Sequence, residues 1–134
     1  MKAKDLRIGN YILSHDKTEF EVRSINDHKH GLSCLDIKTK EGFCVTAEYA
    51  SGIPLTEEWL IKLGFELKTR SPYYSNYFLN GFYISMYTHI KPVAGFEETG
   101  VCYWGDEYLP VRFVHKLQNL YNAATDGLEL EVKL

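Results

Sequence analysis

The dipeptide Asn80-Gly81 constrains the fold more than any other feature of this sequence. A two-residue type I′ turn needs positive φ at both central positions, and Asn-Gly meets that need readily. Apolar residues alternate on both sides of the dipeptide, so the sequence predicts a β-hairpin whose register the turn fixes. In that register the facing pairs are Leu79–Phe82, Phe78–Tyr83, Tyr77–Ile84, Asn76–Ser85, Ser75–Met86 and Tyr74–Tyr87.

Facing residues share a face of a hairpin, so the register also sorts the side chains. One face is predicted to be core and carries Tyr77, Leu79, Phe82, Ile84 and Met86. The opposite face carries Tyr74, Asn76, Phe78, Tyr83, Ser85 and Tyr87. The chain has 10 Tyr, 7 Phe and 2 Trp in 134 residues, and this hairpin places part of that surplus on one surface.

A second hairpin is predicted at Gly105-Asp106, which suits a type II′ turn. It pairs Trp104 with Glu107, Tyr103 with Tyr108 and Cys102 with Leu109, and it turns Cys102, Leu109 and Val111 inward. If both hairpins join one sheet, the face away from the core is a candidate binding surface. Its rings are Tyr74, Phe78, Tyr83, Tyr87, Tyr103 and Tyr108.

The N-terminal part of the chain is typical of short strands separated by polar turns. Strands are predicted over residues 9–13, 20–24, 32–37 and 43–47, and Gly42 is expected to take the positive φ in the turn before the last of them. Such strands suggest a small curled sheet or half-barrel. Residues 89–100, with Pro92 and Gly95, are the best candidate for a mobile loop.

Two helices are predicted. The first has Thr56 as its N-cap, acidic residues in its first turn and Gly64 at its end. The second runs over residues 113–125, with an apolar stripe opposite an amide-rich stripe from which His115 and Asn119 are offered as secondary contact residues. Strict alternation over residues 128–134 predicts a final half-buried strand.

Together these elements predict a single α+β domain over residues 1–134. Residues 1–50 form a half-barrel-like β-subdomain, and residues 51–134 form a twisted antiparallel sheet with two helices packed on one face. The net charge of −3 argues against a nonspecific polyanion binder. Three cysteines without a CxxC pair, and no long apolar run, favour a reduced cytoplasmic protein that does not enter a membrane.

Three stretches of the chain are similar to a known family. They are LRIGNYIL near the start, GIPLTEEWLIKLGFE at residues 52–66 and VHKLQNLYNAATDGLELEVKL at residues 114–134. In order and sequence they resemble a family of small uncharacterised proteins of gut anaerobes and of the phages and mobile elements those bacteria carry. The resemblance implies a phage or mobile-element origin, and it supplies no activity and no catalytic residue.

The potential metal ligands and catalytic residues of the sequence indicate no particular reaction. Potential zinc ligands lie near one predicted hairpin: His28, His30, Cys34 and Cys44. Their spacing matches no closed zinc motif. A GxSxG elbow, a glycine-rich phosphate loop and an HExxH motif are all missing. The neighbours Glu57 and Glu58 point in different directions on a helix, so they are not expected to act as an acid/base pair. Taken together, these observations lead us to expect a non-enzymatic protein without metal or cofactor.

Two binding functions suit the ring-rich face, and a third interpretation is structural. Rings stack on the bases of single-stranded nucleic acid, with Lys68 and Arg70 as cations on the same face if their strand joins the sheet. Protein recognition or self-association needs no such charge and uses tyrosine well, so it is the preferred function, with nucleic-acid binding as the alternative. The structural interpretation is that the N-terminal strands cover the rings as a second core.

Overall fold

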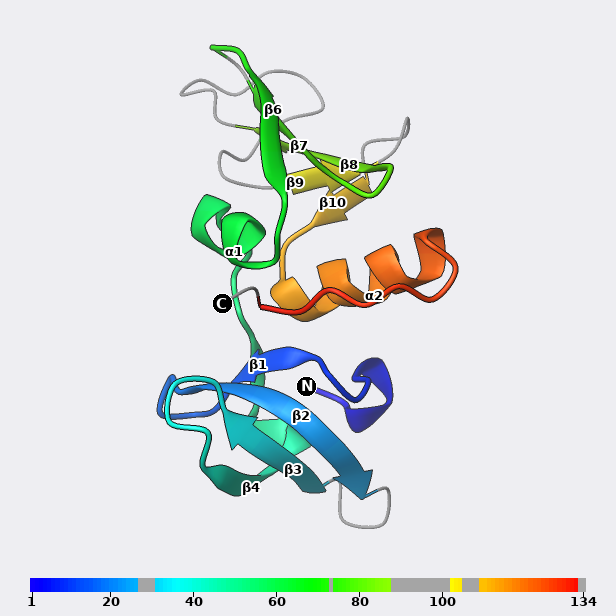
Figure 1. Cartoon of the computed structure of the whole chain (residues 1–134). Helices are drawn as coiled ribbons and strands as arrows, with labels where there is room; N and C mark the ends of the chain where they lie inside the picture. The colour runs from blue at the N-terminus through cyan, green and yellow to red at the C-terminus, as the bar shows by residue number, and fades with distance from the viewer. Residues whose placement is uncertain (27–30, 73, 88–101, 105–108, 133–134) are drawn as a thin grey trace. The chain divides into compact units, whose positions relative to one another are not determined.

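The computed structural model of the protein describes residues 1–26, 31–72, 74–87, 102–104 and 109–132 (Figure 1). Within them the fold is α+β, as predicted, with two antiparallel five-stranded sheets and two α-helices. The backbone divides into two compact units. The first comprises Met1–Pro54 and Phe113–Asn119, and the second comprises Leu55–Arg112 and Leu120–Leu134.

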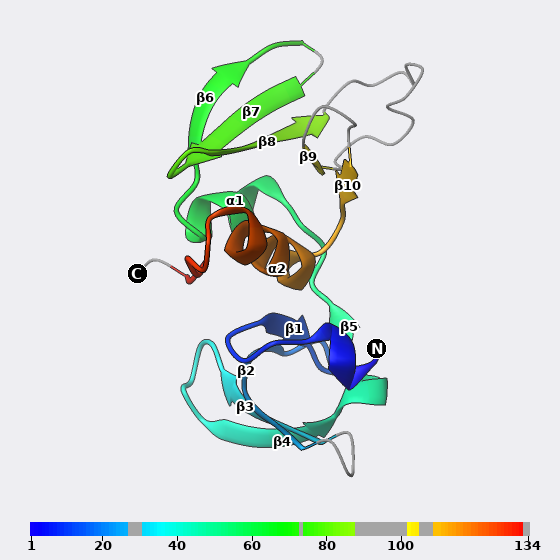
Figure 2. The same ribbon diagram turned by 90° about the vertical axis from the view of Figure 1, so that its right-hand side faces the viewer.

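The first unit is a curled sheet with the strand order β4-β3-β2-β1-β5 (Figure 2). Its strands are β1 (Tyr11–Leu13), β2 (Glu19–Asn26), β3 (Gly31–Asp36), β4 (Gly42–Thr46) and β5 (Ser51–Gly52). Two 3-10 turns, η1 (Ala3–Asp5) and η2 (Ala47–Tyr49), complete it. The strands enclose a core of their own that contains Ile12, Phe20, Val22, Leu32 and Cys34.

The turn between β3 and β4 corrects one expectation. Lys40, with φ of 64°, takes the left-handed conformation that was expected of Gly42. The Asp36 carboxylate accepts hydrogen bonds from the backbone N–H groups of Lys38 (2.8 Å) and Thr39 (3.0 Å), so an Asp side chain organises the turn. The glycine can then begin the strand in an ordinary extended conformation.

The α1 helix (Glu57–Lys62) begins and ends where the sequence predicts. The Thr56 hydroxyl accepts a hydrogen bond from the Trp59 N–H at 3.3 Å, and Glu57 and Glu58 occupy the first turn. Gly64 has φ of 97°, a conformation that favours glycine after a helix.

The second unit holds a sheet with the order β10-β9-β8-β7-β6. Its strands are β6 (Glu66–Arg70), β7 (Tyr74–Leu79), β8 (Phe82–Tyr87), β9 (Cys102–Trp104) and β10 (Leu109–Val111). Asn80 and Gly81 have φ of 49° and 81°, and all the facing pairs predicted for β7 and β8 are confirmed.

The α1 helix and the second half of the α2 helix (Val114–Ala124) lie on one side of this sheet (Figure 2). Tyr121 on α2 packs edge-on against Phe82 on β8 and against Phe65, with ring centroids 5.3 Å and 6.2 Å away. This side is therefore the core face, as the hairpin register predicts.

The predicted final strand is wrong for the residues that the structure describes. Residues 128–132 form no strand, although Leu130 is buried and Leu128 is half exposed. The loop predicted over residues 89–100 lies outside the described residues. Neither of the two described helices is long and apolar enough to cross a membrane.

Candidate functional site

The outer face of the second sheet, opposite the core face, is the candidate site. The register of β7, β8 and β9 places on it Tyr74, Asn76, Phe78, Tyr83, Ser85, Tyr87 and Tyr103. These residues belong to strands that are paired with one another, so the backbone ladder holds the side chains in fixed rows. The prediction that both hairpins join one sheet is confirmed.

The most exposed ring of the outer face, that of Tyr83, lies beside the Asn80-Gly81 turn. Phe78 and Tyr83 face each other across the ladder with ring centroids 4.8 Å apart and an interplanar angle of 44°. Tyr83 is 59% exposed, and Phe78 is partly buried beneath it. The Lys68 ammonium lies 5.2 Å from the Phe78 ring centroid, within the range of a cation–π contact.

A polar row crosses the middle of the outer face. Ser85 donates to the Asn76 side-chain oxygen at 2.5 Å, and the Asn76 amide donates to the Thr69 hydroxyl at 2.8 Å. The row spans β8, β7 and β6, so it separates the Phe78–Tyr83 pair from the rings at the far end of the strands. The outer face is thus two aromatic regions with a hydrogen-bonded strip between them.

Two of the other rings on the outer face are buried, which corrects two predicted binding residues. Tyr87 is 4% exposed and Tyr103 is 9% exposed, and the two form a small hydrophobic cluster of their own. Tyr74, which faces Tyr87, is 45% exposed. Rings so deeply buried contribute to stability rather than to binding. Tyr108 lies outside the described residues.

The predicted register of the second hairpin is wrong by two residues. Trp104 faces Leu109 and Tyr103 faces Pro110, because residues 105–108 all lie between the paired strands. A shift by two keeps every side chain on its predicted face, since strands have a period of two. Cys102 and Val111 are therefore still buried on the core side, whereas Leu109 is 51% exposed.

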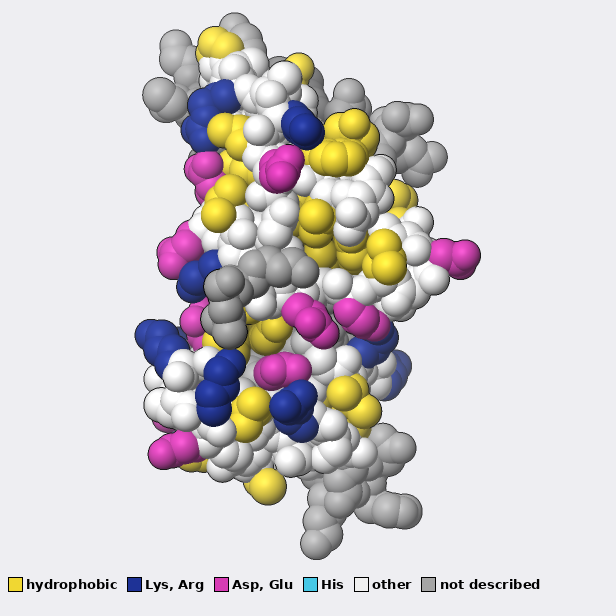
Figure 3. All heavy atoms as spheres, in the orientation of Figure 1, with side chains coloured by type: hydrophobic (Ala, Val, Ile, Leu, Met, Phe, Trp, Pro, Cys, Tyr) yellow, Lys and Arg dark blue, Asp and Glu magenta, His cyan; other side chains and the backbone are white. Residues whose placement is uncertain are grey.

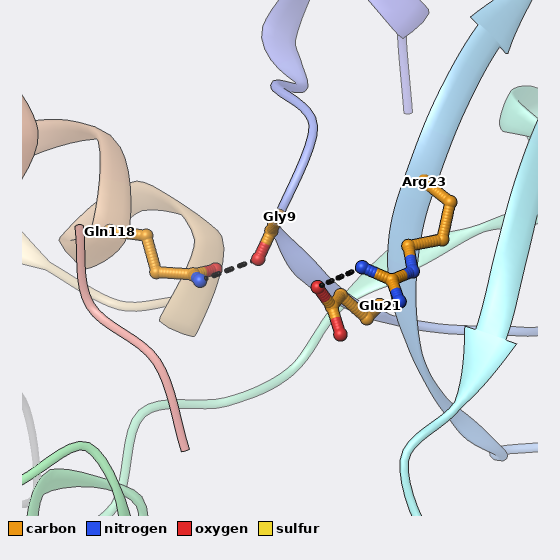
Figure 4. A network of polar contacts seen from close by, with 4 residues as sticks. All are labelled: Gly9, Glu21, Arg23 and Gln118. Carbon is orange, nitrogen blue, oxygen red and sulfur yellow. Dashed lines mark hydrogen bonds and ion pairs between the residues drawn. The ribbon is translucent and has the colours of Figure 1, made fainter. Parts of the chain in front are cut away.

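The amide stripe of α2 is not a free contact surface. His115 is 3% exposed and Gln118 is 1% exposed, and Asn119 is partly buried. Gln118 accepts from the Tyr11 N–H at 2.8 Å and donates to the Gly9 carbonyl at 2.9 Å. Figure 4 shows this side chain reaching from α2 to Gly9, near the Glu21–Arg23 ion pair on β2.

Asn119 belongs to the same network within the first unit. Its side-chain oxygen accepts from Arg7 Nε and from Asn10 Nδ2, each at 2.9 Å, and Nδ2 of Asn119 donates to the Asp5 carbonyl. The sequence analysis did not predict this hydrogen-bond network.

His115 is buried without a partner for one ring nitrogen. Its Nδ1 has no hydrogen-bond partner, and its ring stacks on Phe113 with centroids 5.9 Å apart. Burial lowers the pKa of His115 to about 4; the nearby Lys116 lowers it further, and Asp5 acts in the opposite direction. The imidazole is therefore neutral at pH 7, and it is a core side chain rather than a contact residue.

Gly52 on β5 lies directly against this stack. A Cβ added at Gly52 would lie 2.6 Å from Phe113 Cδ1 and 3.0 Å from His115 Cε1. We expect Gly52→Ala to lower the free energy of unfolding by about 1–3 kcal/mol through overpacking, measured by urea unfolding. Gly42→Ala is the matched control, since its Cβ would meet nothing closer than the Cys34 carbonyl at 3.9 Å. Equal effects of the two substitutions would contradict this packing.

The two cations proposed for the nucleic-acid alternative lie on opposite sides of the sheet. A bulge in β6 falls between Leu67 and Thr69, so Lys68 turns to the outer face over Phe78. Arg70 faces Ser75 on the core side and bonds to Glu57 on α1 at 2.7 Å. The prediction that they share the outer face is wrong.

The carboxylate of Glu57 is held ionised. The Tyr77 hydroxyl and then the Arg70 guanidinium keep the pKa of Glu57 below its usual range. Burial raises the pKa of Tyr77 to about 12, and the nearby Glu57 charge adds to that rise. The Tyr77 hydroxyl is buried close to Glu57 but makes no hydrogen bond of normal geometry. Glu58 instead pairs with Lys62 at 3.2 Å along α1. The two acids therefore do not form an acid/base pair.

The cysteines do not assemble a site in the described part of the chain. Cys34 faces Phe43 and Cys44 faces Ser33, so the two thiols lie on opposite faces of the first sheet. Burial raises the pKa of Cys34 to about 11 and that of Cys102 to about 12, so both remain protonated thiols. Among the described residues no group of three or more His, Cys, Asp or Glu side chains is placed to hold a metal, and His28 and His30 lie outside them.

A shallow groove of about 410 Å³ adjoins the β7–β8 turn in the second unit. Its walls are the turn itself, Trp104 stacked on Phe82 at 5.8 Å, and the end of α2 with Leu128. Figure 3 shows hydrophobic side chains reaching the surface in this part of the molecule. Tyr83 also lines the groove, so the groove continues the apolar surface of the Phe78–Tyr83 pair around the turn.

Comparisons with protein-family models, with curated proteins and with solved structures found no significant match to this chain. The family resemblance therefore remains a prediction from the three sequence stretches.

Proposed function

We propose that this chain is a non-enzymatic binding protein that recognises a protein partner through the end of the outer face that carries Phe78 and Tyr83. The observation that supports this is the Phe78–Tyr83 pair, in which Tyr83 is 59% exposed on a rigid strand ladder. A tyrosine with few rotatable bonds gives a large contact area at low entropic cost. On the family resemblance alone, we propose a phage or mobile-element origin and a modulator of a host protein.

The charges on this face favour a protein over single-stranded nucleic acid. Lys68 pairs with Glu66 at 3.7 Å, and Glu66 itself faces Phe78 on the outer face. Nucleic-acid binding by stacking depends on a positively charged groove along the backbone. The described residues of this face instead offer one cation that already has an anion beside it, which suits a neutral or mixed-charge protein surface.

The edges of the second sheet disfavour recognition by strand addition. The β6 edge carries Glu66, Lys68 and Arg70 together with a bulge, and the three-residue β10 edge contains Pro110. Charges, bulges and proline are the usual devices that prevent another strand from pairing with an edge. A partner is therefore expected to contact the face of this sheet.

The test compares two exposed tyrosines. Tyr83→Ser is expected to weaken partner binding about tenfold or more, as for an aromatic hot spot, and to change stability by less than about 0.5 kcal/mol. Tyr49→Ser is the matched control, because Tyr49 is 65% exposed in the first unit. The partner is captured from the native host with the unaltered protein, and its purified form is then titrated against all three proteins by calorimetry.

Two results would contradict the proposal. Equal affinities of Tyr83→Ser and Tyr49→Ser would show that the outer face does not bind the partner. Retention of the protein on single-stranded DNA, weakened by salt and by Lys68→Ala, would favour the nucleic-acid alternative.

A further inference from the structure

The β4 strand differs from the other sheet edges that the described residues form. Edges usually carry charges, proline, bulges or very short strands that prevent further pairing. The other three have such features: β5 has only two residues, β6 is charged and bulged, and β10 contains Pro110. In contrast, β4 reads Gly-Phe-Cys-Val-Thr and pairs with β3 in an unbroken register.

The free side of β4 presents unpaired backbone groups. The Asp36 N–H donates to the Glu41 carbonyl at 2.8 Å, which fixes the alternation of the β3–β4 ladder. Alternate residues of a strand bond to the same neighbour, so the backbone groups of Phe43 and Val45 bond to β3. The N–H and C=O groups of Gly42, Cys44 and Thr46 point away from β3. None of these outward groups has a partner among the described residues.

The side chains of β4 present apolar surface in the same place. Phe43 is 44% exposed although it packs on Phe20 with ring centroids 5.3 Å apart, and Val45 is partly buried on the same face. The core of the first unit is therefore partly exposed at Phe43, whereas Met1 packs against it and lines a pocket with Thr46 at the other end of the strand. Cys44 is exposed on the opposite face.

We propose that β4 is a self-association edge, which pairs antiparallel with β4 of a second copy of this chain about a two-fold axis at Cys44. The strand is complementary to itself in this register. Phe43 meets the second copy's Val45, Gly42 meets the second copy's Thr46, and the two copies of Cys44 face each other. An interface in which one patch meets its own copy is the usual form of a symmetric dimer.

The charges around β4 agree with this pairing. The exposed turn before the strand carries Lys38 and Lys40 against Glu41, a net charge of +1, and the exposed Glu48 follows the strand. The two-fold axis brings the Lys40 end of one strand to the Glu48 end of the other, so opposite charges meet at both ends. One strand pair buries less than the roughly 1,000 Å² of a stable interface, so the dimer is weak and populated at high protein concentration.

The first test is a charge substitution at the axis. Cys44→Lys places like charges directly opposite each other, and we expect it to raise the dimer dissociation constant about two- to fivefold in sedimentation velocity. Cys44→Thr is the matched control and should leave the constant unchanged. Mixing Cys44→Lys with Cys44→Glu should restore association, because the facing charges are then opposite. A protein that stays monomeric up to about 1 mM, or a dimer indifferent to Cys44→Lys, overturns the proposal.

The second test measures the register. In a Cys44→Ser background, a mixture of Gly42→Cys and Thr46→Cys proteins should yield a cross-linked heterodimer on mild oxidation, and Thr46→Cys alone should not. Cys34 and Cys102 are buried and do not compete. Efficient cross-linking of Thr46→Cys to itself contradicts the register. All these variants leave Tyr83 in the second unit untouched, so the result is independent of the proposed partner site.

Discussion

Replacing Gln118 with alanine is expected to lower the free energy of unfolding by about 2–4 kcal/mol, because it leaves buried backbone groups without partners. The Gln118 amide satisfies both the Tyr11 N–H at 2.8 Å and the Gly9 carbonyl at 2.9 Å. Alanine reaches neither group, and the side chain is only 1% exposed, so little water replaces it. Urea unfolding measures the loss of stability.

Hydrogen exchange localises the same effect. The Tyr11 amide should exchange faster in Gln118→Ala than in the unaltered protein, because its acceptor is gone. The control is Lys116→Ala on the same helix, which changes an exposed side chain and should shift stability by less than about 0.5 kcal/mol. A Gln118→Ala protein as stable as the control would show that water satisfies these groups.

The hairpin at Asn80-Gly81 was predictable because its turn needs no tertiary information. The positive φ values of 49° and 81° at these residues follow from local sterics, and the turn then dictates every facing pair in β7 and β8. Gly105-Asp106 looks equally suitable for a two-residue turn, yet Trp104 faces Leu109 across a longer connection. A local signal allows a tight turn without requiring it.

The failure at the C-terminal segment has a different cause. Leu128, Leu130 and Val132 alternate with charged residues, which predicts a half-buried strand. A strand also needs a neighbour with free backbone groups, and both edges of the second sheet carry features that discourage pairing. Leu130 is nevertheless 1% exposed, so the chain buries the apolar residue without forming a ladder.

The candidate site was predicted in part, for reasons of the same kind. Strand period assigned Tyr83 and Tyr87 to the outer face, but it carries no information on exposure, which is 59% for one and 4% for the other. Helical period likewise separated the amide stripe of α2 from its apolar stripe. It does not distinguish a polar face in water from one that meets buried polar partners, as Gln118 meets Tyr11.

Acidification from pH 7 to pH 4 is expected to remove about 3 kcal/mol of stability through His115. The folded-state pKa is lowered to about 4 from an ordinary value of 6.5, because burial opposes the charged imidazole and Lys116 adds to that opposition. Between these two values the unfolded chain binds the proton and the folded chain does not. The contribution is therefore complete above pH 6.5 and is lost as the pH falls towards 4.

A substitution that cannot titrate isolates this effect from that of the carboxylates. His115→Phe keeps an aromatic ring against Phe113, and its unfolding free energy should be nearly level between pH 6.5 and pH 4.5, whereas that of the unaltered protein falls. The quantity measured is the slope of the unfolding free energy against pH, compared between the two proteins. A loss of stability that the substitution causes equally at every pH does not change this slope. Lowered pKa values at Asp16 and Glu57 affect both proteins alike. If the His115 Cε1–H resonance in the folded protein titrates near pH 6.5, the ring is hydrated, and its orphaned Nδ1 faces water rather than the core.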